Sequence, residues 1–255
     1  MSFSDDELER YARHIVLREV GGSGQRKLSA ARVAVVGAGG LGSPALLYLA
    51  AAGVGHLRVI DDDAVSLSNL QRQVLHRTEA VGRAKVESAA ETLAAVNPHV
   101  VVEGRTERLG GENAAALLGD VDLVLDGSDT FATREVVNRA CVAAGVPLIS
   151  GALSQWEGQV SLFDPQRGGP CYSCIFADPP AEGQAPSCAE AGVMGALAGV
   201  IGAMMAGEAL KVITGAGQPL RGEMLIYDAL WGETRKIRLA ARAGCPVCGG
   251  RGVAI

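Results

Sequence analysis

The sequence has few aromatic residues, no excess of basic residues and no long hydrophobic segment. Phe, Trp and Tyr make up 4% of the 255 residues, and the formal net charge is -5. Because binding to nucleic acid requires a basic face, this charge argues against nucleic acid as the principal partner. One uncharged apolar run, 193–207, has fifteen residues between Glu190 and Glu208, fewer than the roughly 20 that a transmembrane helix needs. We expect this run to form a buried helix, with no membrane as partner.

The chain also lacks internal repeats and the features of a secretion signal. Residues 1–7 contain Asp5, Asp6 and Glu7, whereas a signal peptide begins with a basic region followed by an apolar one. We therefore expect a cytoplasmic location. Structural disulfides are rare in that compartment, which affects how the six cysteines are interpreted.

Apolar runs alternate with helix-like segments through the first 150 residues. The predicted strands are 33–36, 56–60, 99–102, 122–125 and 146–150, and the predicted helices between them are 43–52, 82–96, 112–118 and 131–144. Such alternation is typical of an α/β fold with a doubly wound, Rossmann-like, mostly parallel sheet. Segments 159–163, 222–227 and 234–239 predict antiparallel strands that extend this sheet. We expect one domain, 1–255, in which a leader helix and a nucleotide-binding half (1–150) precede a second half (151–255).

A glycine-rich turn follows the first strand. Gly37, Gly39 and Gly42 have the G-x-G-x-x-G spacing, and Gly40 lies within it. These glycines allow a tight turn, a close approach of a phosphate to the backbone, and close packing of the next helix. The next strand ends at Asp61, about twenty residues further on, where a carboxylate can accept hydrogen bonds from ribose hydroxyls. The sequence therefore predicts a nucleotide site, and by itself this motif fits NAD or FAD.

Other polar residues at predicted strand ends favour a triphosphate instead. Arg13, Arg72 and Lys85 supply cations, Asp129 supplies a carboxylate and Asn69 supplies an amide. Cations neutralise phosphate oxygens, and a carboxylate can hold the magnesium ion that accompanies ATP. An NAD-dependent oxidoreductase has no use for this set, so it remains the weaker alternative.

Four of the six cysteines form two C-x2-C pairs, Cys171 with Cys174 and Cys245 with Cys248. Four thiolates suit the tetrahedral coordination of structural zinc and leave no ligand position open for a substrate water. Redox dithiols or disulfides are the alternatives, and the expected compartment disfavours structural disulfides. Cys141 is expected in the core.

Together these motifs resemble the ThiF/MoeB/HesA family, the bacterial relatives of ubiquitin-activating E1 enzymes, and the match is nearest to its MoeB branch. The resemblance covers essentially the whole chain. It is carried by the segments 10–15, 37–42, 66–73, 82–86 and 126–129 and by the two cysteine pairs. A non-catalytic E1-like scaffold is a further alternative, which the presence of every cationic residue of the set disfavours.

The resemblance implies ATP-dependent adenylation of the C-terminal Gly-Gly carboxylate of a small ubiquitin-like sulfur carrier, with release of pyrophosphate. It implies molybdenum cofactor biosynthesis, or alternatively thiamine thiazole synthesis, with a separate protein as sulfur donor. It also implies a homodimer in which Arg13 reaches the partner subunit's ATP, and a carrier tail lying under the segment 178–188. The residues implied to bind ATP and Mg²⁺ are Gly37, Gly39, Gly40, Gly42, Asp61, Asp63, Ser68, Asn69, Leu70, Gln71, Arg72, Lys85, Asp129 and Thr130. Cys188 matches a cysteine that some members use in covalent sulfur transfer, although adenylation needs no thiol and we favour a loop cysteine.

Overall fold

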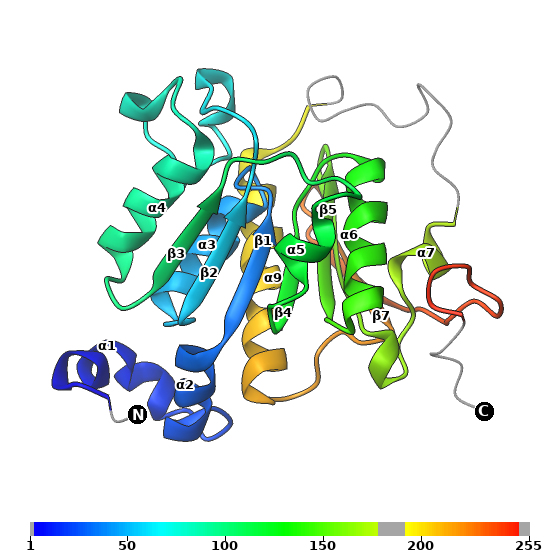
Figure 1. The fold of residues 1–255 in the computed structure, drawn as a ribbon, viewed down its shortest axis with the longest axis horizontal. Helices are drawn as coiled ribbons and strands as arrows, with labels where there is room; N and C mark the ends of the chain where they lie inside the picture. The colour runs from blue at the N-terminus through cyan, green and yellow to red at the C-terminus, as the bar shows by residue number, and fades with distance from the viewer. Residues whose placement is uncertain (1–2, 178–191, 250–255) are drawn as a thin grey trace.

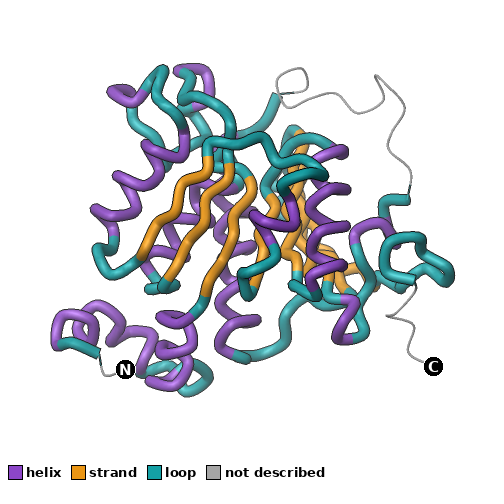
Figure 2. The backbone as a smooth tube through the Cα atoms, in the orientation of Figure 1, coloured by secondary structure: helices purple, strands orange, loops and turns teal. Residues whose placement is uncertain are grey.

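The computed structural model describes residues 3–177 and 192–249, and within them one mixed sheet organises the chain (Figures 1 and 2). Its strand order is β3-β2-β1-β4-β5-β6-β7-β8. Strands β1 to β5 run parallel, and β6, β7 and β8 pair antiparallel to their neighbours. The strands are β1 (Arg32–Val36), β2 (His56–Ile60), β3 (Val101–Arg105), β4 (Leu123–Asp126), β5 (Leu148–Ser154), β6 (Glu157–Phe163), β7 (Glu223–Asp228) and β8 (Glu233–Arg238). The predicted fold class is confirmed.

Helices cover both faces of the parallel part of the sheet (Figure 1). α3, α4 and α9 lie on one face, and α5, α6 and α7 lie on the other. The helices are α1 (Asp5–Ile15), α2 (Gly21–Ala30), α3 (Gly42–Ala51), α4 (Lys85–Val96), α5 (Ala114–Leu118), α6 (Phe131–Ala144), α7 (Tyr172–Ile175) and α9 (Gly195–Thr214), with short 3-10 turns at Leu67–Asn69, Thr78–Ala80 and Pro165–Arg167.

The apolar run of β1 is continuous because this central strand is buried on both faces. Val33 and Val35 join the core cluster formed with α3 and α9, while Ala34 and Val36 join the cluster formed with α5 and α6. All four side chains are 4% exposed or less. The strand therefore holds the turn that follows it, 37–42, on a rigid base at the carboxyl edge of the sheet.

The apolar helix α9 is longer than the predicted run 193–207. It has 20 residues and continues past Glu208 to Thr214, so by length and composition it could cross a membrane. However, it packs against α2, α3, β5 and β6, and Leu197, Ile201 and Met205 are at most 1% exposed. The carboxylate of Glu208 is buried and accepts a hydrogen bond from the Leu220 N–H at 2.7 Å. The prediction of a core helix is confirmed.

The leader helix α1 and the helix α2 lie at the amino edge of the sheet, at the opposite end from the glycine turn (Figure 1). A capping box at Ser4 and Glu7 begins α1. Tyr11 anchors this helix, since its hydroxyl accepts from Asn97 Nδ2 at 2.9 Å. The glycines at 21, 22 and 24 lie inside α2, which begins at Gly21.

Candidate functional site

The glycine turn has the close packing that its spacing predicts. Gly37 has a φ of +91°, a conformation that favours glycine. A Cβ atom added to Gly42 would lie 1.8 Å from the Gly37 carbonyl oxygen. The turn thus folds back against the first turn of α3 and leaves no room for a side chain. Backbone N–H groups at this helix start can face an anion.

Asp61 ties the end of β2 to this turn. One carboxylate oxygen accepts from the Ala38 N–H at 2.7 Å, and the other accepts from the Asp63 N–H at 2.9 Å. The Asp61 side chain is 8% exposed, and burial raises its pKa against the opposing charge of Lys85. Asp61 therefore fixes the turn and keeps a carboxylate beside it.

Lys85 lies between two carboxylates at the start of α4. Its Nζ is 2.7 Å from Asp63 Oδ2 and 3.6 Å from Asp61 Oδ1. An isolated bridge between Ala64 and Ala84, together with a bond from the Lys85 N–H to the Asp63 carbonyl at 3.0 Å, brings the two segments together. A buried ammonium group paired in this way keeps a fixed position next to the glycine turn.

Arg72 approaches the turn from the segment after β2. Its stem atoms Cγ and Cδ lie 3.5 Å from the position that a Cβ on Gly40 would take. The Arg72 guanidinium donates to Asn69 Oδ1 at 2.8 Å, which orients both side chains. The short 3-10 turn that carries Ser68 and Asn69 was not predicted. Gln71, in the same segment, packs its carbonyl oxygen against Gly195 at the start of α9.

His76 is a site residue that sequence reasoning missed. Its Nε2 lies 2.9 Å from the Ala38 carbonyl, and its Nδ1 lies 3.0 Å from the Ser88 hydroxyl. Because a carbonyl can only accept, Nε2 carries the proton, and burial lowers the pKa of this ring. The neutral imidazole thereby links the glycine turn to α4. A histidine after an apolar pair carries no sequence pattern that would reveal this contact.

The segment after β4 lies on the other side of the glycine turn. The Gly127 N–H donates to the Val36 carbonyl at 3.0 Å, and a Cβ on Gly37 would come within 3.3 Å of the Gly127 oxygen. Asp129 follows in the exposed part of this segment, and Thr130 caps α6 by accepting from the Thr133 N–H at 3.2 Å. Asp129 is thus carried by the strand adjacent to β1.

One predicted residue, Arg13, does not join this group within one chain. Arg13 is exposed on α1, at the amino edge of the sheet, whereas the glycine turn is at the carboxyl edge (Figure 1). Cys188 and the segment 178–188 lie outside the described residues. A trio of carboxylates that could hold a metal, Asp61 to Asp63, was not predicted, and Lys85 already neutralises part of its charge.

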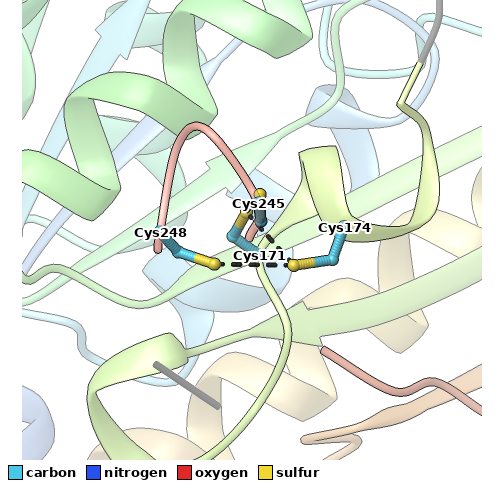
Figure 3. Close-up of side chains that lie close together, drawn as sticks. All are labelled: Cys171, Cys174, Cys245 and Cys248. Carbon is cyan, nitrogen blue, oxygen red and sulfur yellow. Dashed lines mark hydrogen bonds between the residues drawn. The ribbon is translucent and has the colours of Figure 1, made fainter. Parts of the chain in front are cut away.

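The two cysteine pairs meet beside α7 at the edge of the molecule, away from the glycine turn (Figures 1 and 3). The Sγ atom of Cys171 lies 3.7 Å from the Sγ atom of Cys174 and 3.7 Å from that of Cys245, and Cys174 Sγ lies 3.5 Å from Cys248 Sγ. These separations exclude disulfides, whose sulfurs are bonded at about 2.05 Å. All four side chains are buried, between 0% and 9% exposed.

The four sulfurs fit a zinc ion. Four ligands at about 2.3 Å in a tetrahedron lie roughly 3.8 Å from one another, which matches the observed spacing. Burial raises the pKa of the Cys171 and Cys174 thiols, whereas in Cys245 the backbone N–H groups of Cys248 and Val247 outweigh burial and lower the pKa to about 6. The set is closed by four thiols, as in structural zinc sites, with Val142 of α6 packed against it. Cys141, by contrast, is a core residue at 2% exposure, as predicted.

The doubly wound sheet, the glycine turn and the charged groups around it define a nucleotide-binding protein of the E1-like fold class. The model of the ThiF family matches residues 11–247, and the chain belongs to that family. It is 51% identical to the sulfur carrier protein adenylyltransferase of Thermus thermophilus, over 98% of this chain and 93% of that protein. It is 47% identical to the molybdopterin-synthase adenylyltransferase of Escherichia coli, over 96% of this chain and 98% of that protein.

A solved structure shares the fold. The crystal structure of E. coli MccB superimposes with a TM-score of 0.83 at 24% identity, covering 96% of this chain and 74% of that one. At this identity the likeness concerns the fold alone. Each of the two relatives named above is called an adenylyltransferase, which supports nucleotidyltransferase activity for the family member described here.

Proposed function

We propose that this protein adenylates the C-terminal carboxylate of a small ubiquitin-like sulfur carrier ending in Gly-Gly, using ATP and releasing pyrophosphate. The relatives named for sulfur-carrier and molybdopterin-synthase adenylation support this activity and its place in molybdenum cofactor biosynthesis. The structural observation that carries the proposal is the placement of Arg72 and Lys85 beside the glycine turn from two different segments. An oxidoreductase that binds NAD would have no use for these two cations.

The chemistry needs no general base from the protein. A C-terminal carboxylate has a pKa of about 3.5 and is already ionised at neutral pH. The enzyme has to hold this anion against the α-phosphate of ATP and stabilise the negative charge that develops on the departing pyrophosphate. Fixed cations in a site partly closed to water are suited to that task.

We assign roles to the site residues on this basis. Arg72 and Lys85 face the phosphates, Asn69 orients the α-phosphate, and Asp61 accepts from the ribose hydroxyls. Asp129 holds the Mg²⁺ that accompanies ATP and offsets the charge of its phosphates. The residues that complete the nucleotide site are Gly37, Gly39, Gly40, Gly42, Asp63, Ser68, Leu70, Gln71 and Thr130.

We further propose that the enzyme acts as a homodimer. Arg13 belongs to α1, which lies at the opposite end of the sheet from the glycine turn. This position supports the role that the family resemblance implies, a contribution to the site of a second copy. The residues 1–255 then act as one adenylating domain, located in the cytoplasm, with a separate protein as sulfur donor. We assign a structural zinc to the cysteine cluster, where the metal would cross-link α7 to the segment that carries Cys245.

Exchange of radiolabelled pyrophosphate into ATP tests the proposal. Exchange should require a carrier protein that ends in Gly-Gly and should stop when that tail is removed, and the protein should not bind NAD. Isolation of the endogenous carrier with its tail, followed by mass measurement, separates a molybdopterin carrier from a thiazole carrier. Exchange that proceeds without any carrier would contradict the proposed substrate.

A further inference from the structure

The segment that carries Asp129 is hydrogen-bonded to Arg134 of α6. Both Nε and Nη2 of Arg134 donate to the Ser128 carbonyl oxygen, at 3.2 and 2.7 Å. Within the segment, the Ser128 N–H donates to Asp126 Oδ1 at 2.9 Å, while Asp126 Oδ2 and Ser128 Oγ are buried without a hydrogen-bond partner. The two bonds from Arg134 fix the Ser128 carbonyl, next to Asp129, from α6.

The first turn of α6 is itself packed against Tyr172 of α7. Phe131 is the first residue of α6, and its ring centroid lies 5.9 Å from that of Tyr172. The Tyr172 ring is 4% exposed and packs between Phe163 and Phe176, with ring centroids 5.6 and 4.6 Å away. A ring fixed in this way gives the start of α6, which directly follows Asp129 and Thr130, a rigid surface to pack on.

Tyr172 in turn lies between two cysteines of the zinc cluster, Cys171 and Cys174. Asn138 clamps the same short helix, because its Oδ1 accepts from the Tyr172 N–H at 2.9 Å and its Nδ2 donates to Ser173 Oγ at 2.9 Å. Cys171 and Cys174 in turn contact the second cysteine pair, Cys245 and Cys248. Release of the cluster would free α7 on the side that Asn138 does not hold.

One face of α6 connects these contacts. Arg134, Asn138 and Val142 follow each other at intervals of four residues, which places them in one row along the helix. Arg134 contacts the segment before Asp129, Asn138 clamps α7, and Val142 packs against the cysteines. The row joins the cysteine cluster to the nucleotide end of β4, two places that lie apart in the fold (Figure 1).

We propose that Arg134 is a positioning residue for Asp129 and that the cysteine cluster, with its metal bound, supports the start of α6 through the ring of Tyr172. The inference rests on the proposed function, since it gives Asp129 the magnesium ion of ATP. The cluster then has two effects: it stabilises the fold, and it sets the position of a site residue. The binding of ATP-bound magnesium should respond to changes in this row even when the fold remains intact.

The first test replaces Arg134 by lysine, which keeps the charge and removes the two-bond fork. The matched control is Arg139→Lys on the same helix, where the arginine pairs with Glu135 at the surface. In Arg134→Lys we expect the Mg²⁺ concentration for half-maximal pyrophosphate exchange to rise about tenfold, as for the loss of one charge-assisted hydrogen bond. Amide hydrogen exchange of 127–130 should accelerate, while zinc content and melting temperature stay close to wild type. Arg139→Lys should match wild type in magnesium dependence, amide exchange, zinc content and melting temperature.

The second test uses Tyr172→Leu, which removes the ring contact with Phe131, and wild type stripped of zinc by a chelator. Both should show faster amide exchange at 127–130, while the amides of β1 remain protected. If either change unfolds the whole protein, the β1 amides will reveal it and Arg134→Lys decides. Normal magnesium dependence and normal exchange of 127–130 in Arg134→Lys and Tyr172→Leu would overturn the inference. A wild-type protein without carrier-dependent exchange would instead contradict the proposed function.

Discussion

Arg72 and Asp129 are the single residues whose loss should affect the chemistry most directly. Arg72→Ala and Asp129→Ala each remove charge stabilisation from the transferring phosphate, so the rate of carrier-dependent exchange should fall by about a hundredfold or more. Both side chains lie outside the core, and the melting temperature should stay near that of wild type. The control is Arg77→Ala, which removes an exposed arginine five positions further on. Exchange at a near-normal rate in either variant would contradict the assigned roles.

His76 should make the stability of the protein depend on pH. Burial lowers the pKa of the folded-state ring, whereas the unfolded chain binds a proton near pH 6.5. Since the unfolded state then holds more protons, the free energy of unfolding should decrease as the pH falls below about 6.5. Lys85 and Asp61 face the same ring, and the raised pKa of Asp61 gives a contribution of opposite sign at lower pH.

The comparison with His76→Gln isolates the contribution of the His76 ring to the pH dependence of stability, because both proteins share Asp61 and Lys85. Urea unfolding between pH 5 and 8 should show a weaker loss of stability on acidification in the variant. The variant should also be less stable at pH 8 by about 1–3 kcal/mol, the typical effect of leaving a buried polar group unpaired. Parallel pH profiles for the two proteins would show that the ring titrates normally.

Residue types and spacing were enough to predict candidate cations and metal ligands, but not what supports them. Lys85 and Arg72 stood out only as members of a set, with Arg13, Asp129 and Asn69, at predicted strand ends. His76 and Arg134 were missed because their partners are backbone carbonyls, Ala38 and Ser128. A carbonyl acceptor leaves no complementary residue in the sequence, so such contacts become visible only in three dimensions.

At the scale of elements, the turn between β1 and α3 should tolerate no side chain at Gly42. Gly42→Ala would place a methyl group 1.8 Å from the Gly37 carbonyl, so the turn has to open. We expect a loss of ATP binding, measured by calorimetry, and a drop in unfolding free energy of about 1–3 kcal/mol. Gly199→Ala is the control within α9, where nothing lies within 4 Å of the new methyl. It should be neutral or stabilising by up to about 1 kcal/mol.

Element types were predicted well, and their boundaries less so. Helix α6 matched its prediction because Thr130 caps its start and Gly145, in the left-handed conformation, ends it. Strand β3 was placed at 99–102 but runs from Val101 to Arg105. Its edge position explains the error: β2 sets the register, pairing Ile60 with Arg105. The charged residues of this edge strand show no apolar alternation, so periodicity could not locate its end.

At the scale of the whole molecule, the cysteine cluster connects α7 to the segment near residue 248. Cys248→Ser should release zinc and lower the melting temperature by about 5 °C or more, because ~1 kcal/mol shifts Tm by about 2–4 °C in a chain of this size. Zinc content by mass spectrometry and a thermal scan check both effects. Restoring zinc to chelated wild type should recover the original Tm. Loss of zinc with unchanged melting would show that the cluster contributes little to stability.

The central claim is that this molecule activates the Gly-Gly carboxylate of a sulfur carrier with ATP. The most direct measurement is pyrophosphate–ATP exchange with purified carrier, with the same carrier lacking its last two glycines, and with no carrier. We predict exchange only with the intact tail, and its loss in Arg72→Ala. Equal exchange in all three reactions, or none with any Gly-Gly carrier, would contradict the account.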